Sequence, residues 1–118
     1  MSNNLPEVIC KALDDKKGEN IQVIDLREVE GAICDYFVVT NADSSVQVGA
    51  LADNVEKECF EKLREKVIRV QGLENSLWVA MDYGEVMVHI FQSEMRDYYR
   101  LEELWSDAPI SRYESSES

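Results

Sequence analysis

The clearest pattern in this sequence is a run of alternating apolar residues that is interrupted once by a turn. The run is Leu77-Trp78-Val79-Ala80-Met81-Asp82-Tyr83-Gly84-Glu85-Val86-Met87-Val88-His89-Ile90-Phe91. A two-residue loop at Tyr83–Gly84 would pair Trp78 with His89 across a predicted hairpin. Because side chains alternate between the faces of a strand, the run divides into two sets. One face is aliphatic (Leu77, Val79, Met81, Val86, Val88, Ile90), and the other holds Trp78, Ala80, Met87, His89 and Phe91.

The two faces of this hairpin predict different surroundings. The aliphatic face is typical of a core, whereas the aromatic face fits either a core or a partly covered surface that is open to a partner. Tyr and Trp anchor protein interfaces because they bury large rigid surfaces and keep a polar group. Both readings stay open for Trp78 and Tyr83, while Phe91 and Trp105 are expected in the core. Tyr83, at the turn, is predicted to be the most exposed.

The remaining elements follow from periodicity and from capping residues. Helical spacing predicts helices that begin near Leu5, Ser45 and Ser93, and β-branched apolar runs predict strands at Ile21–Leu26, Tyr36–Thr40 and Val67–Val70. Ser44 and Gln47 have the spacing of a capping box, and an apolar stripe continues as far as Val67. The expected order is αββαβββα, an α/β fold with a mixed five-stranded sheet and flanking helices. Residues 1–108 form one predicted domain, and residues 109–118 form a polar tail expected to be disordered.

The charge balance of the 118 residues is strongly acidic. Twelve Lys and Arg face 24 Asp and Glu, for a formal net charge of −12. Nucleic-acid binding draws on clustered basic residues, and no such cluster occurs, so no direct nucleic-acid partner is expected. An acidic protein is attracted to basic proteins, although the same charge also serves solubility alone. The N-terminus lacks a signal-peptide pattern and no run has transmembrane length, which predicts a cytoplasmic protein without a membrane partner.

Residues that could perform chemistry are few and scattered. His89 is the single histidine and lies within an apolar run, where a hydrogen-bonded structural role is more common than general-base chemistry. Neither a nucleophile elbow nor a glycine-rich phosphate loop occurs. Glu28 and Glu30 are the best carboxylate pair for a metal, yet such a spacing is expected by chance in an acidic chain. No catalytic residue, metal site or cofactor is therefore predicted.

The hairpin and the last helix resemble the Iojap/RsfS family of ribosomal silencing factors. The matching residues are Trp78-x-x-x-Asp82-Tyr83-Gly84-x-x-x-Val88-His89-x-Phe91 and Arg96-x-x-Tyr99-x-Leu101-Glu102-x-x-Trp105. Asp35-Tyr36-Phe37-Val38-Val39 and Ser45-x-Gln47-Val48 resemble the family's second strand and following helix. Together these motifs span most of residues 5–108. The chain departs from the family at Asn41-Ala42-Asp43-Ser44, where members often carry Ser-Gly-Thr-Ser, so the geometry of this loop is expected to differ.

The resemblance implies a binding protein and not an enzyme. Members have a fold related to nucleotidyltransferases and usually form homodimers. They bind large-subunit ribosomal protein fourteen where the small subunit docks, and so block subunit association and repress translation in starvation or stationary phase. The nucleotidyltransferase signature, a Gly-Ser pair followed by an Asp-x-Asp strand, is missing from this chain.

The resemblance also suggests which residues contact the ribosomal protein. The expected set is Trp78, Asp82, Tyr83, Gly84, His89, Arg96 and Glu102. Arg96 could instead pair with Asp82 or Glu94 and hold the last helix. Two other functions stay open: an adaptor for large-subunit assembly, and a nucleotidyltransferase-like enzyme that uses carboxylates such as Asp25, Glu28 or Glu30.

Overall fold

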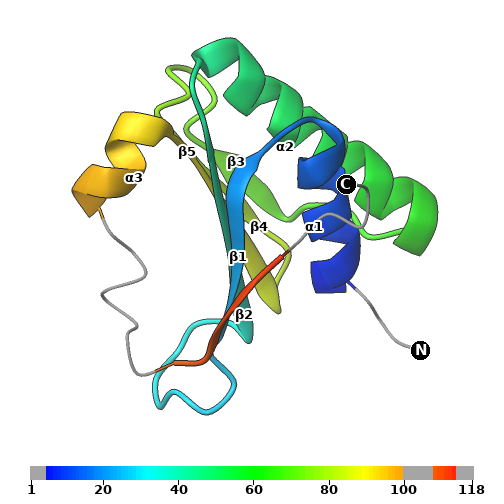
Figure 1. The fold of residues 1–118 in the computed structure, drawn as a ribbon. Helices are drawn as coiled ribbons and strands as arrows, with labels where there is room; N and C mark the ends of the chain where they lie inside the picture. The colour runs from blue at the N-terminus through cyan, green and yellow to red at the C-terminus, as the bar shows by residue number, and fades with distance from the viewer. Residues whose placement is uncertain (1–4, 100–107, 114–118) are drawn as a thin grey trace.

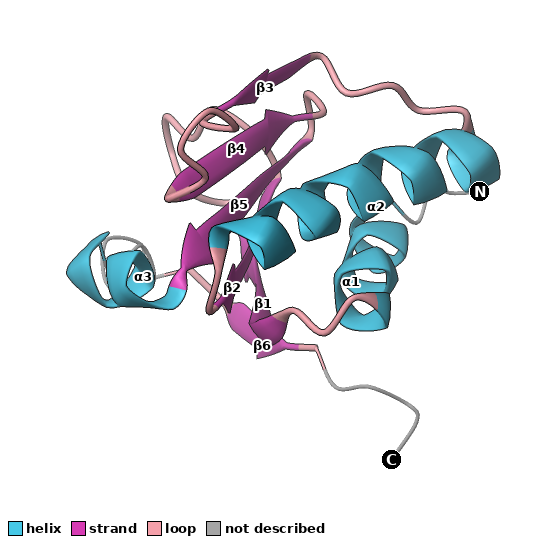
Figure 2. Cartoon of the chain, turned by 90° about the horizontal axis from the view of Figure 1, so that it is seen from above, coloured by secondary structure: helices cyan, strands magenta, loops and turns pink. Residues whose placement is uncertain are grey.

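A mixed sheet with helices on both sides organises the chain, as Figure 1 shows for the computed structural model. The structure describes residues 5–99 and 108–113. Helices α1, α2 and α3 cover Leu5–Asp15, Ser45–Leu63 and Ser93–Tyr99, and strands β1 to β6 cover Glu19–Asp25, Tyr36–Ala42, Arg69–Gln71, Trp78–Asp82, Val86–Gln92 and Ile110–Arg112. Helices α1 and α2 lie on one face and α3 lies on the other (Figures 1 and 2). The predicted α/β class and element order are confirmed, with β6 added at the end.

The sheet has the strand order β3-β4-β5-β2-β1-β6. Among the described strands, β2 and β5 form the one parallel pair, and the other neighbours are antiparallel. Every residue of β2 after Tyr36 is buried, which confirms the central strand predicted from its unbroken apolar run. The connection from β2 to β5 contains α2, β3 and β4. Within this connection, α2 lies across one face of the sheet (Figure 2).

The two faces of the β4–β5 hairpin are divided as the alternation predicts. The aliphatic side chains of one face are buried in the core beneath α1 and α2 (Val79, Met81, Val86, Val88, Ile90). On the opposite face, Trp78, Met87 and Phe91 belong to a second, smaller cluster. Leu77 lies before the start of β4 and is 40 % exposed. The register differs from the predicted one, because Trp78 pairs with Phe91 instead of His89.

The hairpin turn lies one residue later than predicted. The Tyr83 N–H donates to the Val86 carbonyl at 2.9 Å, so the two-residue loop is Gly84–Glu85. Gly84 has a φ of +92°, which suits the first loop position of a type II′ turn and which few other residues adopt. The Asp82 carboxylate accepts the Gly84 N–H at 2.8 Å and fixes the loop. The demand for a glycine at that position, together with this cap, selects the later turn.

Helix α2 begins where the sequence predicts. The Ser44 hydroxyl accepts the Gln47 N–H at 3.1 Å, which confirms the N-cap. The Gln47 side chain does not complete the predicted capping box. Its amide donates to the carbonyls of Lys16 and Lys17 at 3.2 Å each, and so ties the start of α2 to the connection after α1.

Other boundaries differ from those predicted. Helix α2 ends at Leu63, because Arg64 adopts a left-handed φ of +57°. The apolar stripe, which was predicted to continue to Val67, therefore extends beyond the end of the helix. Strand β3 begins two residues after the predicted start of Val67–Val70. The last helix was predicted to include Trp105, which lies outside the described residues, and α3 is described as far as Tyr99.

The predicted disordered tail contains a strand. Ile110–Arg112 pairs antiparallel with β1, so the sheet has six strands and the prediction of five is wrong. All three side chains of β6 are exposed, so this short edge strand is held by its backbone pairing with β1 and not by side-chain packing. The sequence of β6 therefore has no alternation of apolar and polar residues from which the strand could be predicted. Residues 114–118 of the predicted tail lie outside the described residues.

Gly72, after β3, is predicted to be essential for the path of the chain into β4. It has a φ of +96°, and a Cβ there would collide with the Trp78 carbonyl. Gly72→Ala should lower the free energy of unfolding by about 1–3 kcal/mol through strain. Gly49→Ala, in α2, has nothing within 4 Å of the new Cβ and should raise it by about 0.5–1 kcal/mol. Urea denaturation of both variants measures this, and equal effects would contradict it.

Candidate functional site

Four rings from three neighbouring strands gather on the face of the sheet opposite α1 and α2. This aromatic cluster consists of Phe37 from β2, Trp78 from β4, and His89 and Phe91 from β5. Trp78 stacks on Phe91 with 5.0 Å between ring centroids and 28° between planes. Phe37 meets His89 edge-to-face at 4.6 Å. Each ring is thus held by a neighbour on an adjacent strand.

Trp78 is the one ring of these four that reaches the surface. Phe37 and His89 are each 5 % exposed and Phe91 is fully buried, whereas Trp78 is partly exposed. The expectation that Phe91 belongs to the core is confirmed. Trp78 combines the two readings that its sequence context left open, since it packs on the cluster and still presents part of its indole. An aromatic ring held in this way is typical of an interface anchor.

A hydrogen bond joins Trp78 to His89. The indole Nε1–H donates to Nδ1 of His89 at 3.0 Å. Nδ1 can accept this bond only without its own proton, so a neutral His89 carries its hydrogen on Nε2. Nε2 is buried and has no hydrogen-bond partner among the described residues. Burial lowers the pKa of His89 to about 4, so the ring is neutral at cellular pH.

Tyr83 is a core residue and not the exposed contact that its place near the turn suggested. It is 5 % exposed and belongs to the core beneath α1 and α2. Its hydroxyl lies near the Cys59 thiol, a weak partner, and forms no regular hydrogen bond among the described residues. Burial raises the pKa of Tyr83 well above its usual range. The prediction was wrong because the turn begins one residue later, which leaves Tyr83 in the strand register.

Asp82 and Gly84 lie far from Trp78. Asp82 lies four positions after Trp78 along an extended strand, a distance of about 13 Å at roughly 3.3 Å per residue. Asp82 is partly buried and holds the turn, and Gly84 is exposed at the hairpin tip. The two ends of β4 therefore present separate surfaces, which the sequence motif had placed in one set.

Arg96 anchors α3 to the sheet. It is 8 % exposed, and its guanidinium donates to the Asn20 carbonyl at 2.7 Å, to Asn41 Oδ1 at 2.8 Å and to Gln22 Oε1 at 3.0 Å. The predicted ion pair with Asp82 or Glu94 is not among these contacts. Arg96 thus has the structural role that the sequence left open, and these three acceptors are neutral. Glu102, the other charge expected at the contact surface, lies outside the described residues.

The Arg96 contacts continue into a polar network that the sequence did not reveal. Asn41 Nδ2 donates to Ser93 Oγ at 2.9 Å, and Ser93 Oγ donates to Asp43 at 2.8 Å. Asn41 and Asp43 lie in the segment 41–44, where the chain departs from the expected motif, and Ser93 opens α3. Asp43 thereby holds the start of α3. Partners 50 or more residues apart leave no local signal in a sequence.

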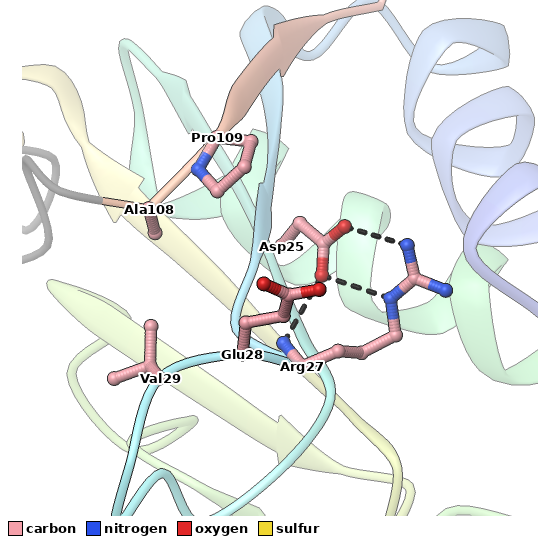
Figure 3. A pocket seen from close by; sticks show the side chains of 6 residues that line it. All are labelled: Asp25, Arg27, Glu28, Val29, Ala108 and Pro109. Carbon is pink, nitrogen blue, oxygen red and sulfur yellow. Dashed lines mark hydrogen bonds and ion pairs between the residues drawn. The ribbon is translucent and has the colours of Figure 1, made fainter.

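Two of the three carboxylates considered for catalysis, Asp25 and Glu28, line one pocket, which Figure 3 shows. The pocket has a volume of about 560 Å³ and is lined by Asp25, Arg27, Glu28, Val29, Ala108 and Pro109. The Arg27 guanidinium binds both oxygens of Asp25 at 2.9 and 2.7 Å. These hydrogen bonds lower the pKa of the Asp25 carboxyl. Asp25 is thus engaged by an arginine, and Glu30 does not line the pocket.

Residues 5–99 and 108–113 contain neither a metal-binding cluster nor a membrane-spanning helix. Within these ranges, no group of three or more His, Cys, Asp and Glu is arranged to hold a metal ion. No helix there has both the length and the apolar character needed to cross a bilayer.

Comparisons with known proteins decide the family. The family model for "Ribosomal silencing factor during starvation" matches residues 1–118. This chain belongs to that family. It is 37 % identical over 115 residues to ribosomal silencing factor RsfS of Halalkalibacterium halodurans, covering 97 % of each chain. It is 34 % identical to RsfS of Bacillus subtilis, covering 89 % of this chain and 87 % of that one.

The fold agrees with that of a solved structure. The crystal structure of a Chromobacterium violaceum protein superimposes with a TM-score of 0.81 at 30 % identity, covering 97 % of this chain and 93 % of that one. The family resemblance carried by the hairpin and last-helix motifs is therefore confirmed.

Tyr83 provides a test of which motif residues are structural. Tyr83→Ala should lower the free energy of unfolding by about 3 kcal/mol, because it leaves a cavity beneath the helices. Tyr83→Phe should change it by less than about 1 kcal/mol, because the hydroxyl has no strong partner to lose. Urea denaturation measures both. If Tyr83→Ala is as stable as the parent protein, the assignment of Tyr83 to the core is wrong.

The buried His89 predicts a dependence of stability on pH. Its pKa is about 4 when folded and roughly 6.5 when unfolded, so its contribution is complete above pH 6.5 and falls between pH 6.5 and 4. In that window the unfolded chain binds a proton that the folded chain excludes. Between pH 7 and pH 5 the loss should be about 2 kcal/mol.

The matched control for this pH effect is His89→Leu. The free energy of unfolding of His89→Leu should fall less between pH 7 and pH 5 than that of the parent protein. Only the titration of the carboxylates, which both proteins share, should still lower it. Urea denaturation of both proteins at the two pH values measures the difference. The same decline in both would show that His89 is not the group responsible.

Proposed function

We propose that this protein binds the large ribosomal subunit through ribosomal protein fourteen and sterically prevents the small subunit from joining. The observation that carries the proposal is the match of the silencing-factor family over residues 1–118. In this mechanism one bound copy occupies the intersubunit surface of the ribosomal protein, so that the small subunit cannot form its contacts there. Translation falls in starvation or stationary phase as a result, and the protein acts by binding without catalysis.

The charge of the chain supports a ribosomal protein as the partner. Ribosomal proteins are generally basic, and a chain with a formal net charge of −12 is attracted to them and repelled by ribosomal RNA. Such long-range attraction raises the rate of encounter and suppresses wrong partners more than it strengthens the final complex. The local contact must then supply most of the affinity.

Trp78 is the proposed centre of that contact. It belongs to the family motif, it is partly exposed, and the aromatic cluster holds it against Phe91 and His89 of β5. Rigid aromatic anchors lose little conformational entropy on binding, which is why they dominate interface energies. Tyr83, His89 and Arg96 act behind the surface because they are buried, and Asp82 supports the turn.

The free protein is proposed to be a cytoplasmic homodimer. The exposed ring that meets the ribosomal protein is also a surface that a second copy could cover. Binding to the ribosome then competes with self-association if the two contacts share Trp78.

A subunit-joining assay tests the proposal. Purified ribosomal subunits are mixed with increasing amounts of this protein and separated on a sucrose gradient. Joined ribosomes should decrease, and the protein should migrate with free large subunits. Trp78→Ala should weaken binding to the large subunit at least about tenfold, as expected for an anchor residue worth more than about 1.4 kcal/mol.

Phe60→Ala is the matched control for Trp78→Ala. Phe60 is 40 % exposed on α2, which covers the other face of the sheet, so its loss should change binding less than about twofold. Circular dichroism confirms that both variants are folded at the temperature of the assay. If the parent protein binds no large subunit and joining is unchanged, the proposal fails. Equal losses of binding in Trp78→Ala and Phe60→Ala would show that Trp78 is not the centre of the contact.

A further inference from the structure

We propose that His89 is a positioning residue, which fixes the orientation of the Trp78 indole on the surface that meets the partner. The inference rests on the proposed function for its consequence in binding, and on the aromatic cluster for its geometry. His89 is 5 % exposed, so it acts through Trp78 and does not itself touch a partner.

The hydrogen bond between the two side chains fixes the indole in one orientation. Trp has a single polar atom, the Nε1–H, and it donates to Nδ1 of His89 at 3.0 Å. The stacking on Phe91, with 28° between the planes, fixes the tilt of the same ring. Stacking alone would allow the indole to slide or turn over on Phe91. The hydrogen bond removes that freedom, because only one orientation brings Nε1 to Nδ1.

The imidazole is itself held in place. Phe37 contacts it edge-to-face at 4.6 Å between centroids, and Phe91 lies on the same face with 6.4 Å between ring centroids. Turning the ring over would move Nδ1 away from the indole and leave the Nε1–H without its acceptor. The support therefore runs from Phe37 on β2 through His89 on β5 to Trp78 on β4.

A histidine at this place is unfavourable for stability alone. Its Nε2 is buried without a hydrogen-bond partner among the described residues, and burying an unpaired polar group is costly. An aliphatic side chain would fill the same space without this penalty. What the aliphatic residue lacks is an acceptor for Trp78. The buried acceptor thus serves the orientation of the surface ring and not the stability of the core.

Two substitutions separate these roles. His89→Leu keeps a buried side chain of similar size and removes the acceptor. His89→Asn places a carbonyl oxygen near the position of Nδ1 and can accept the same bond. The first readout needs no ribosome: hydrogen exchange of the Trp78 indole Nε1–H by NMR. The chain has two tryptophans, and the resonance missing from Trp78→Phe belongs to Trp78.

The expected results are specific to positioning. The Trp78 indole hydrogen should exchange at least tenfold faster in His89→Leu than in the parent protein, and within about threefold of it in His89→Asn. Binding to large subunits should weaken at least fivefold in His89→Leu and be restored to within about twofold in His89→Asn. Trp78→Phe, which keeps a stacked ring without the donor, should weaken binding similarly. The double variant should be no weaker than either single one, because both remove the same bond.

Each outcome bears on one of the two proposals. If His89→Leu binds like the parent protein while Trp78→Ala does not, positioning by His89 is wrong and the proposed function stands. If the parent protein binds no large subunit, the proposed function fails, and the indole exchange still decides whether His89 fixes Trp78. Should His89→Leu not fold, the comparison of Trp78→Phe with His89→Asn decides: equal loss of binding in both would overturn positioning.

Discussion

The structure depends on the parallel pairing of β2 with β5, which runs from Tyr36 opposite Val86 to Ala42 opposite Gln92. Parallel neighbours need a long connection between them, and here it contains α2, β3 and β4. Central strands of this kind must be covered on both faces. Helices α1 and α2 cover one face with aliphatic contacts, and this leaves the opposite face for a different kind of packing (Figure 2). The difference in packing between the two faces of the sheet follows from the parallel pairing of β2 with β5.

The second face is held by aromatic and polar contacts. The aromatic cluster spans β2, β5 and β4, and the Arg96 contacts tie α3 to β1 and β2 through Gln22 and Asn41. Polar networks depend on geometry more strictly than aliphatic contacts do, so they fix the position of α3 against the sheet. The same face carries Trp78, and its rigidity is what allows a partly exposed ring to keep a defined direction.

Periodicity predicted the larger features of this fold, and single residues account for its errors. Alternation along residues 77–91 divided the hairpin correctly into an aliphatic and an aromatic face. The same alternation assigns Tyr83 to the aliphatic face together with Val79 and Met81. Placing the turn one residue too early removed Tyr83 from the strand, and a core residue was read as a surface residue. Turn position is set by Gly84 and its Asp82 cap, which are local details that hydrophobic pattern does not contain.

Other features could not be predicted from the sequence, for a different physical reason. Strand β6 is held through backbone groups, so its side chains carry no pattern. The three acceptors described around Arg96 are 55 or more residues away in the sequence, and they converge on it only once the sheet and α3 are assembled. The sequence named Trp78 and His89 as motif residues, but their hydrogen bond crosses between strands and depends on the true register. The residues of the family motif could thus be recognised from the sequence, and their separate structural roles could not.

Charge and shape act at different ranges in the proposed contact. A net charge of −12 attracts a basic partner in many orientations, and it therefore says little about how the two surfaces meet. Orientation must come from a feature that is local and rigid, and Trp78 has both properties. Its direction depends on an acceptor that stays unprotonated at cellular pH. Burial within the cluster keeps His89 in that state by lowering its pKa to about 4. The unpaired Nε2 is the consequence of that burial, so the fold gives up some stability to keep one surface ring in place.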